Sequence, residues 1–437
     1  MTIRSRLFII IAMIVVVLGG AWAYFGRSDT ARLSVEAVTG VKPLITAPRI
    51  ESIPTVGVAD VIGWQGAAKP IAAPGLSVNA FAADLDHPRW LYELPNGDVL
   101  VAETNSPPRP ADGVKGFVMK TLMSKAGAGV ASPNRILLLR DTNGDGVADF
   151  RSVLLTGLDS PFGMALVGDR LFVGNHNALV AFPFKVGDTK ITAPAQKIVA
   201  LPGGGNHWAK NIVADPAGKL LYIAVGSSTN IAENGLDAEK NRANILEYNL
   251  GTHAIRIYAA GLRNPVGMGW EPKSKRLWTV VNERDQLGSD LAPDYLTLVD
   301  LGAFYGWPYS YWGGYEDPRV EPRPDLLQYT RRPDYALGPH TASLGLAFGS
   351  LGSFRDGAFI GQHGSWNRRP MSGYKVTFVP FGARGFPEGR MQDVLTGFLD
   401  SDGKAQGRPV GVIVDKAGSL LVADDVGNRI WRVSAGR

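Results

Sequence analysis

Apolar and polar positions along the chain follow one phrase that recurs from about Leu76 onward. Each copy has a turn containing Pro or Gly, a short apolar strand, a tight turn such as Pro-Asn-Gly-Asp at 95–98, and a second apolar strand that ends in polar residues. Roughly 50 to 85 residues separate one copy from the next, which leaves room for two more strands in each. The six copies span residues 87–105, 160–176, 207–228, 263–285, 344–364 and 408–425.

This repeat predicts an all-β fold, a six-bladed β-propeller with four-stranded blades, over residues 76–437. A β-sandwich is the alternative for a chain of many short strands, but it gives no reason for the same phrase to appear six times. The 53 glycines and 29 prolines also favour short strands and tight turns over long helices.

The N-terminus has a different pattern, an apolar stretch from Leu7 to Phe25 that as a helix is long enough to cross a bilayer. We expect residues 1–27 to be a transmembrane signal-anchor or a signal peptide. The small residues of Ala21-Trp22-Ala23 resemble a cleavage site, so cleavage and retention both stay open.

The basic flank of that stretch, Arg4 and Arg6, predicts that the rest of the chain lies outside the cytoplasm. We therefore expect an exported, periplasmic protein anchored to the membrane by its N-terminal helix. Residues 28–75 have neither helical nor strand periodicity and are interpreted as a tether and lead-in to the propeller.

Composition narrows the choice of partners and cofactors. The net charge of +5 is spread over both signs without a run of Lys or Arg, so no nucleic-acid partner is expected. The chain has no cysteine, which excludes disulfides, Cys-ligated zinc, iron–sulfur clusters and covalently attached c-type haem. A redox cofactor would have to be held without thiols.

The repeat also predicts which polar residues meet. The two strands of each copy form an antiparallel hairpin, so the start of the first and the end of the second lie at the same end of the blade. Four of the chain's six histidines fall among these positions. The residues expected on this face include His87, Arg89, Asn175, His176, His207, Arg263, Asn264, Asn282, Glu283, Asp285, His363, Arg408 and Asp424.

Two kinds of chemistry are suggested by this set. A neutral His207, delivered by a glycine-rich approach, is suited to take a proton from a hydroxyl, although a histidine bonded to a neighbouring turn is the alternative interpretation. The guanidinium of Arg263, with Arg368, Arg369 and Arg408 on the same face, favours an anionic ligand, although any single arginine is more often a surface ion pair.

Two segments are candidate cation sites. Main-chain carbonyls at the strand end formed by Asn282 and Glu283 are suited to hold a cation. The glycine-bent stretch 141–149 carries oxygen-bearing side chains in the spacing of a calcium loop but lacks the Glu and flanking helices of an EF-hand. A metal-free turn is the alternative for this second loop, whose candidate ligands are Asp141, Asn143, Asp145 and Asp149.

Several motifs together resemble the PQQ-dependent sugar dehydrogenases (PQQ is pyrroloquinoline quinone), most closely the L-sorbosone dehydrogenase-like branch, and are also similar to the soluble aldose (glucose) dehydrogenases. The resemblance covers about residue 76 to the C-terminus. The segments that carry it are 160–164 (SPFGM), 206–211 (NHWAKN), 261–267 (GLRNPVG), 281–285 (VNERD), 304–309 (FYGWPY), 361–368 (GQHGSWNR) and 407–411 (GRPVG).

The resemblance implies a propeller that binds PQQ, an ortho-quinone with three carboxylates, together with Ca²⁺. His207 matches the general base of that family, and Arg263 and Asn264 match residues that touch the quinone. The carbonyls of Asn282 and Glu283 match ligands of the PQQ calcium. The further cofactor-binding residues that the resemblance implies are Arg368, Arg408, His363 and Asn282.

The implied reaction is oxidation of a sugar or sugar aldehyde, of the aldose or L-sorbosone type. His207 would remove a proton while hydride passes to PQQ, and Arg263 would stabilise the developing oxyanion. Related sequences often have a second histidine before the base, where this chain has Asn206, which leaves the substrate preference open. Without a cysteine for a fused cytochrome c, electrons would leave to a separate acceptor, a quinone or a cytochrome.

Two other functions remain alternatives at this stage. A propeller lactonase or other metal-dependent hydrolase would need several side-chain carboxylates around its metal, whereas the convergent set is richer in arginine. A non-catalytic exported propeller that binds a partner on this face is the third reading, because fold does not dictate function.

Overall fold

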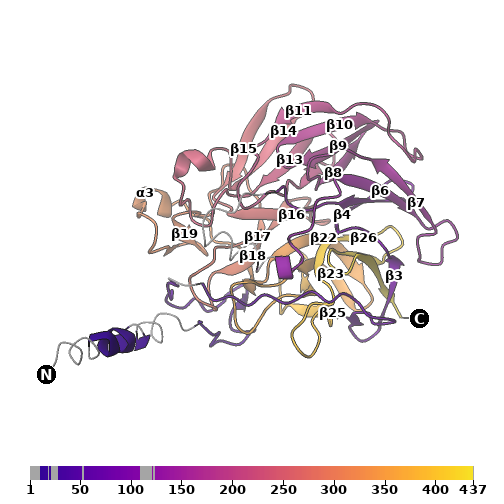
Figure 1. The fold of residues 1–437 in the computed structure, drawn as a ribbon. Coiled ribbons are helices and arrows are strands. Elements are labelled where there is room, and N and C mark those ends of the chain that lie inside the picture. The colour runs from indigo at the N-terminus through magenta and orange to yellow at the C-terminus, as the bar shows by residue number, and fades with distance from the viewer. Residues whose placement is uncertain are drawn as a thin grey trace.

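Six antiparallel sheets follow one another along the chain in the computed structural model, which describes residues 10–17, 19–20, 28–51, 54–108, 121 and 124–436 (Figure 1). The innermost strands of the sheets contact one another in cyclic order, the sixth returning to the first. The predicted six-bladed propeller is therefore confirmed, with blades of four strands, two of which gain a short fifth strand.

The strands of blades one to three run in chain order from the innermost to the outermost. Blade one holds β4 (Pro88–Glu93), β5 (Val99–Glu103), β6 (Arg135–Arg140) and β7 (Phe150–Leu155). Blade two holds β8 (Met164–Val167), β9 (Arg170–Asn175), β10 (Ala178–Pro183) and β11 (Gln196–Ala200). Blade three holds β12 (Ile212–Ala214), β13 (Leu220–Val225), β14 (Asn244–Asn249) and β15 (Ile255–Ala260), with the 3-10 helix η1 (Leu236–Glu239) between β13 and β14.

Blades four to six follow the same order, but each takes a strand from the N-terminal part of the chain. Blade four holds β16 (Asn264–Trp270), β17 (Leu277–Asn282), β18 (Pro293–Leu298), β21 (Tyr335–Pro339) and β1 (Thr39–Gly40). Blade five holds β22 (Ser343–Leu351), β23 (Phe354–Gln362), β24 (Lys375–Pro380), β25 (Gln392–Thr396) and β2 (Ile71–Ala72). Blade six holds β26 (Pro409–Val414), β27 (Leu420–Asp424), β28 (Arg429–Ala435) and β3 (Leu76–Ala82).

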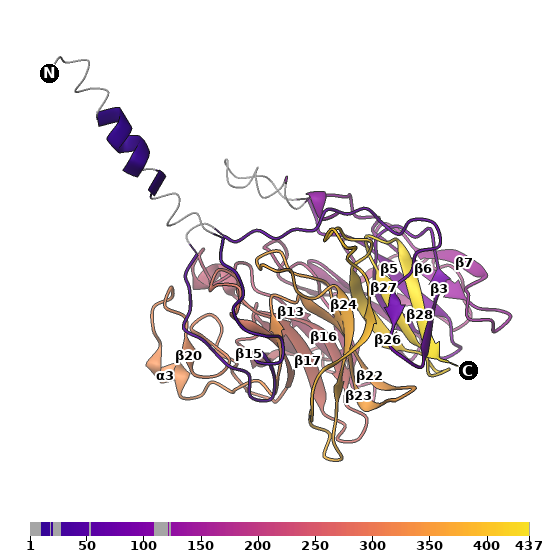
Figure 2. The same cartoon turned by 90° about the horizontal axis from the view of Figure 1, so that it is seen from below.

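The ring is closed by β3, which supplies the outermost strand of blade six although it comes first in the propeller sequence. It pairs antiparallel with β28, from Ala82 opposite Ile430 to Leu76 opposite Ala435. Figure 2 shows the two strands side by side near the C-terminus. The two ends of the propeller sequence are thus joined by one hydrogen-bonded ladder.

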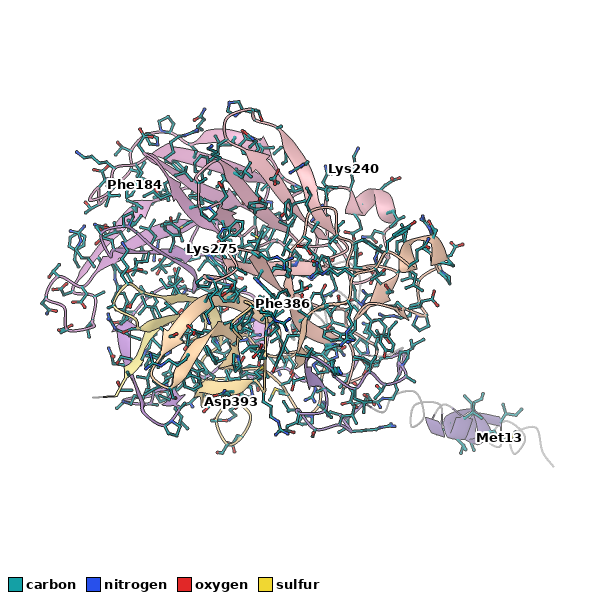
Figure 3. The ribbon with its side chains drawn as sticks, turned by 180° about the vertical axis from the view of Figure 1, so that it is seen from behind. Met13, Phe184, Lys240, Lys275, Phe386 and Asp393 are labelled. Carbon is teal, nitrogen blue, oxygen red and sulfur yellow. The ribbon has the colours of Figure 1, made fainter. Side chains whose placement is uncertain are left out.

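The blades pack face to face through apolar side chains. Central strands such as β5 and β13 are almost entirely buried, because both faces of their sheet are covered by neighbouring blades. Between blades four and five, the buried Trp278 packs edge-on against Phe381 and Phe386, with ring centroids 5.0 and 5.8 Å apart. Phe386 is labelled in Figure 3. The core is therefore divided among the spaces between blades, leaving the strand ends to form the site.

The connection between the third and fourth strands of blade four is long. Between β18 and β21 the chain makes an excursion, residues 299–334, that holds the hairpin β19 (Ser310–Tyr311) and β20 (Tyr315–Glu316) and the short helix α3 (Pro324–Leu327) (Figure 1). The first part of the excursion runs beside the end of β15, where the Tyr305 N–H donates to the Ala260 carbonyl. The excursion thereby reaches the face where the second strands of the blades end.

The segment interpreted as a tether and lead-in lies against blades four and five over its described residues. β1 pairs with β21 and β2 with β25. Between them, Arg49 forms ion pairs with Asp29 and with the buried Asp290, at 2.7 and 3.2 Å. This segment covers the outer edges of two blades that carry site loops.

Residues 10–17 and 19–20 are helical. The predicted membrane or signal helix from Leu7 to Phe25 falls partly on residues outside the described set, namely 7–9, 18 and 21–25. Among the described residues, no helix combines the length and the apolar character that a membrane crossing requires.

Ring closure yields a stability prediction on β3. Val78 is buried against blade six, whereas its neighbour Ser77 is exposed on the same strand. Val78→Asp is expected to lower the free energy of unfolding by more than about 3 kcal/mol, because it buries an unpaired carboxylate. Ser77→Asp should cost less than about 1 kcal/mol. Urea denaturation measures both, and equal losses would contradict the closing role of β3.

Candidate active site

Residues from blades three, four and five surround a cavity of about 130 Å³ on the face where the first strands of the blades begin. Six of the residues expected on this face lie on its walls: His207, Arg263, Asn264, Asn282, Glu283 and Asp285. The lining residues are His207, Arg263, Asn264, Asn282, Glu283, Asp285, Asp294, His340, Ala342, Gly364, Ser365 and Trp366.

His207 reaches the cavity from the loop before β12. Its Nδ1 lies 2.8 Å from the Ser227 carbonyl oxygen and 3.0 Å from the Ser227 hydroxyl. A proton donated from Nδ1 to the carbonyl leaves Nε2 as the basic nitrogen of the neutral ring. Ser227 thereby sets both the orientation and the tautomer that a general base at this position needs.

Arg263 is held by acceptors from two other loops. Its Nη2 donates to Asn230 Oδ1 at 2.9 Å and pairs with Asp285 Oδ2 at 3.2 Å, and its Nε donates to the Asn230 carbonyl at 3.2 Å. Its Nη1 donates to the Glu283 carbonyl at 2.6 Å. The guanidinium is only 5% exposed, so its direction is set by these partners.

Asn264 lies directly beside His207 because the residue facing both is a glycine. A methyl group built on Gly226 would lie 2.4 Å from Asn264 Oδ1 and 2.5 Å from His207 Cβ. No side chain fits there, so the amide and the imidazole share one wall of the cavity.

The end of β17 offers oxygen atoms from its main chain rather than from its side chains. The Asn282 amide donates to the Ser343 carbonyl, and the Glu283 carboxylate accepts from Arg284 Nε at 2.8 Å. The carbonyls of both residues face Arg263 Nη1, at 3.4 and 2.6 Å. Behind them, Asp294 Oδ1 accepts the Glu283 N–H at 2.8 Å, and burial raises the pKa of Asp294 to about 6.

Asp285 and His340 form a buried pair next to Arg263. His340 Nδ1 lies 3.3 Å from Asp285 Oδ1, and its Nε2 lies 3.1 Å from the Gly288 carbonyl. Burial alone would raise the pKa of Asp285, but the hydrogen bond from His340 and the charge of Arg263 outweigh it and lower the pKa. Burial would lower the pKa of His340, but Asp285 outweighs it and raises the pKa.

A second polar cluster surrounds Asp425 where blades five, six and one meet. Asp425 Oδ2 lies 2.7 Å from Arg89 Nη1, 2.8 Å from His363 Nε2 and 3.6 Å from His87 Nε2. Burial raises the pKa of Asp425, but its three partners hold it well below the usual range. Burial, with Arg408 nearby, lowers the pKa of His363 to about 3, and burial lowers that of His87 to about 4.

The remaining predicted cofactor contacts do not line the cavity. Arg408 donates from Nε to the His363 carbonyl at 3.2 Å, which places it beside the Asp425 cluster. Arg368 donates to the carbonyls of Ser289 and Pro370, at 2.9 and 2.7 Å, within the loops that meet the lead-in. The roles proposed for Arg368, Arg408 and His363 stay predictions.

The 141–149 loop joins β6 to β7 at the face opposite the cavity. Its oxygens bind the loop's own main chain: Asp141 accepts from the Gly144 and Gly146 N–H groups at 2.7 and 2.8 Å, and Asp149 accepts from that of Thr142 at 2.8 Å. The second calcium at Asp141, Asn143, Asp145 and Asp149 stays a prediction. Within the described ranges, no three His, Cys, Asp or Glu side chains are grouped to hold a metal, as the hydrolase alternative would need.

The repeat did not single out Asp294, His340 or Asn230 as site residues. Asp294 begins β18 and His340 follows β21, the third and fourth strands of blade four, whereas the repeated phrase covers only the first two strands. Asn230 lies in the loop after β13. Strand topology could have pointed to Asp294 and His340, because the third strand of a blade begins, and the fourth strand ends, at the same face as the site.

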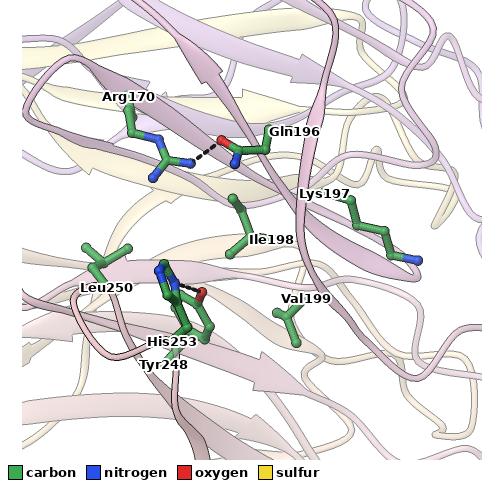
Figure 4. Close-up of a pocket in the computed structure, with 8 residues that line it drawn as sticks. All are labelled: Arg170, Gln196, Lys197, Ile198, Val199, Tyr248, Leu250 and His253. Atoms are coloured by element: carbon green, nitrogen blue, oxygen red, sulfur yellow. Dashed lines mark hydrogen bonds between the residues drawn. The ribbon is translucent and has the colours of Figure 1, made fainter.

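A larger hollow, of about 190 Å³, lies away from this chemistry (Figure 4). It is placed at the opposite face, because Arg170 begins β9, whose other end is Asn175. Hydrogen bonds from Arg170 to Gln196 at 2.6 Å and between Tyr248 and His253 at 2.8 Å line it. None of the residues that line it was predicted as a site residue, so the smaller cavity is the candidate site.

Known proteins resemble this chain along the propeller. A family model described as TrAA12-like matches residues 70–293 and 327–436. The chain is 32% identical over 272 residues to a pyrroloquinoline quinone-dependent pyranose dehydrogenase of Coprinopsis cinerea, covering 48% of this chain and 37% of that protein. It is 28% identical over 162 residues to the aldose sugar dehydrogenase YliI of Escherichia coli, covering 33% and 41%.

Solved structures agree on the fold. The PQQ domain of the Coprinopsis cinerea pyranose dehydrogenase, in its holo form, has a TM-score of 0.67 at 19% identity over 86% of this chain and 100% of that one. A calcium structure of the Trichoderma reesei family AA12 enzyme has a TM-score of 0.67 at 18% identity, covering 84% and 97%. The chain spans 37% to 60% of the length of the curated relatives it matches.

The depressed pKa of His363 yields a prediction for acid stability. Because the folded protein holds this group neutral down to about pH 3, against 6.5 ordinarily, unfolding takes up a proton below about pH 6.5. The stability that His363 contributes in its neutral form is fully present above about pH 6.5 and is lost as the pH falls toward 3. His363→Gln should make the free energy of unfolding fall less steeply between pH 6 and 4, by about 1.4 kcal/mol per pH unit. Denaturant titrations at several pH values measure this, and an unchanged slope would show that His363 is not held neutral.

Proposed function

Since the chain belongs to the TrAA12-like family, we propose that it is a PQQ- and calcium-dependent dehydrogenase that oxidises a sugar or sugar aldehyde with His207 as its general base. The family match supports the resemblance to PQQ-dependent sugar dehydrogenases expected from the motifs. The single observation that carries the proposed chemistry is the cavity in which a histidine of fixed tautomer faces a buried arginine and the carbonyls of a strand end.

The residues present fit a flat polyanion such as PQQ. Arg263 and Asn264 supply donors on one wall, and Trp366 supplies an aromatic side chain on another. Toward blade one, Arg89 Nε is buried and, among the described residues, has no hydrogen-bond partner. Around Asp425, burial keeps His363 and His87 neutral, so Arg89 and Arg408 are the charged basic side chains near this carboxylate. A buried donor without a partner, such as Arg89 Nε, favours a carboxylate of the ligand as its acceptor.

The residues also fit Ca²⁺, which prefers oxygen ligands. The carbonyls of Asn282 and Glu283 would hold it, and the buried carboxyl of Asp294 behind Glu283 would add negative charge nearby. The same carbonyls accept hydrogen bonds from Arg263 Nη1, so the guanidinium lies next to the proposed cation site.

In the proposed mechanism the protein positions groups and moves one proton. His207 Nε2 takes the proton of the substrate hydroxyl, while Ser227 holds Nδ1 and keeps the ring in the competent tautomer. Arg263, aimed into the cavity by Asn230 and Asp285, stabilises negative charge that develops there. When bound, PQQ would supply the two-electron acceptor and Ca²⁺ would polarise its carbonyl.

The proposal includes the surroundings of the enzyme. The apolar stretch from Leu7 to Phe25 after two arginines supports export to the periplasm with the N-terminal helix as membrane anchor. The absence of cysteine supports a separate electron acceptor, a quinone or a cytochrome. Both can be tested by fractionating cells and by supplying the acceptors to the purified enzyme.

Cofactor binding tests the proposed function directly. The purified protein, incubated with Ca²⁺ and PQQ, is expected to bind PQQ in isothermal titration calorimetry and to reduce a redox dye with aldoses or sorbosone. Removing Ca²⁺ with EGTA should weaken PQQ binding, because the carbonyls then hold no cation. Absence of both PQQ binding and dye reduction with every sugar would overturn the proposal.

His207→Ala tests the general base. The variant should lose about 10²- to 10⁴-fold in kcat, the usual contribution of a positioned base, while its affinity for PQQ changes little. His253→Ala, at the opposite face, is the matched control and should keep full activity. Steady-state dye reduction measures kcat, and an active His207→Ala enzyme would remove His207 from the mechanism.

A further inference from the structure

The blade-four excursion, residues 299–334, contacts the site although none of its residues lines the cavity. Much of it also lies between the two segments matched by the family model, which stops at residue 293 and resumes at 327. Two of its hydrogen bonds reach Asn230 and Asp285, which both hold Arg263. We propose that this excursion is a positioning element, in which Trp307 and Arg319 fix the cradle that aims the Arg263 guanidinium at the bound anion. The inference rests on the proposed function, because it assigns these residues to the same site.

The cradle consists of Asn230 and Asp285. The Asn230 carbonyl accepts from Arg263 Nε at 3.2 Å and its Oδ1 accepts from Arg263 Nη2 at 2.9 Å. Asp285 Oδ2 pairs with the same Nη2 at 3.2 Å. The two residues are also bound to each other, since Asn230 Oδ1 accepts the Asp285 N–H at 2.9 Å and Asn230 Nδ2 donates to the Asp285 carbonyl at 3.1 Å. The position of Arg263 therefore follows that of this pair.

Trp307 holds the Asn230 side of the cradle. Its indole Nε1 donates to the Asn230 carbonyl at 2.9 Å, the same oxygen that accepts from Arg263. The ring is 4% exposed, and the Trp307 N–H donates to the Gly261 carbonyl at 3.1 Å, two residues before Arg263. An indole fixed at both its ring and its main chain leaves the Asn230 carbonyl little freedom to turn.

Arg319 holds the Asp285 side. Its Nη1 donates to the Asp285 carbonyl at 2.8 Å, while its Nε and Nη2 grip the two oxygens of Asp317 at 2.9 and 2.7 Å. Asp317 is buried and is also bound by the fully buried Arg284, at 3.3 Å. This bidentate grip fixes the plane of the Arg319 guanidinium, so its remaining donor points at one main-chain oxygen.

Arg284 connects the excursion to the strand end that carries the candidate calcium carbonyls. Besides Asp317 and Glu283, it donates to the carbonyls of Pro308 and Ser310 at 2.8 and 2.7 Å. The excursion is thus bound to Arg284 by a network of charged hydrogen bonds. It is bound to the cradle by two single donors, Trp307 Nε1 and Arg319 Nη1. Removal of those two donors leaves the Arg284 network in place, which permits a test that does not unfold the excursion.

The excursion itself offers a matched control pair. Arg323 and Asp325 repeat the spacing of Asp317 and Arg319, with a bidentate grip at 2.8 and 2.7 Å, but both are largely exposed. No hydrogen bond or ion pair among the described residues joins Arg323 to the cradle. Trp270 is the control for Trp307, because its Nε1 likewise donates to a main-chain carbonyl, that of Ala214 at 2.7 Å, at the other end of β16.

The experiment compares Trp307→Phe with Trp270→Phe, and Arg319→Lys with Arg323→Lys, in the full chain with Ca²⁺. Each pair makes the same chemical change, and only the first member touches the cradle. We measure PQQ affinity by calorimetry, the sugar KM and kcat by dye reduction, and the thermal unfolding midpoint. Trp307→Phe and Arg319→Lys are each expected to weaken PQQ binding and to lower kcat by about fivefold, the range for one lost hydrogen bond, while the sugar KM stays unchanged. The controls should match the wild type in affinity and kcat.

The outcomes separate this inference from the proposed function. If the wild type binds PQQ and the cradle variants behave like their controls, the excursion has no positioning role and the proposed function stands. If all four variants lose thermal stability but keep PQQ affinity, the contacts are structural only, and the inference is likewise overturned. If the wild type neither binds PQQ nor reduces the dye, the proposed function itself fails.

Discussion

The close approach of neighbouring innermost strands is the constraint on which the rest of the structure depends. In four blades a glycine within the first strand, or just before it, faces the next blade. These glycines are Gly163, Gly267, Gly345 and Gly411. A methyl group on Gly345 would lie 2.2 Å from the Val410 carbonyl oxygen, and one on Gly163 would lie 2.3 Å from the Ile212 nitrogen. A side chain at either position would push two blades apart, and β3 could not then meet β28. The site residues, which come from separate blades, face one another only in the closed ring.

Inside that ring the electrostatics are set by carboxylates that are each shared by more than one basic side chain. Asp285 serves Arg263 and His340, and Asp425 serves Arg89, His363 and His87. Both carboxylates keep lowered pKa values in spite of burial, so both stay ionised at neutral pH. At the Asp425 cluster burial keeps His363 and His87 neutral, so Arg89 is the charged partner of this carboxylate, with Arg408 nearby. At the Asp285 cluster Arg263 lies between this carboxylate and the carbonyls of a strand end.

The sequence was sufficient to predict the ring of six blades and to place one set of residues on the face that carries the site. One set of site residues lies at the ends of the two strands that the repeated phrase describes, so antiparallel pairing alone brings them to one face. These residues are His207, Arg263, Asn264, Asn282 and Glu283. The directions of their side chains could not be predicted in the same way. The Glu283 carboxylate turns toward Arg284, which also pairs with Asp317, 33 residues further along the chain. No local pattern indicates such a contact, and the same applies to Asn230 and Arg319 around Arg263.

Segments outside the repeat give the site loops their individual shapes. Loop 285–290 is bound on one side by the excursion, through the Asp285 carbonyl and Arg319. On its other side the lead-in binds it, as the Arg49 N–H donates to the Leu287 carbonyl at 2.9 Å and the Arg32 N–H to Asp290 at 3.0 Å. The repeat can place six similar strand ends on one face, but it contains nothing that makes one end differ from the next. The difference comes from these two segments. The excursion fixes the Asp285 carbonyl beside Arg263, and the lead-in fixes the Trp366 carbonyl, which accepts the Gly57 N–H at 2.8 Å. Arg263 and Trp366 both line the cavity.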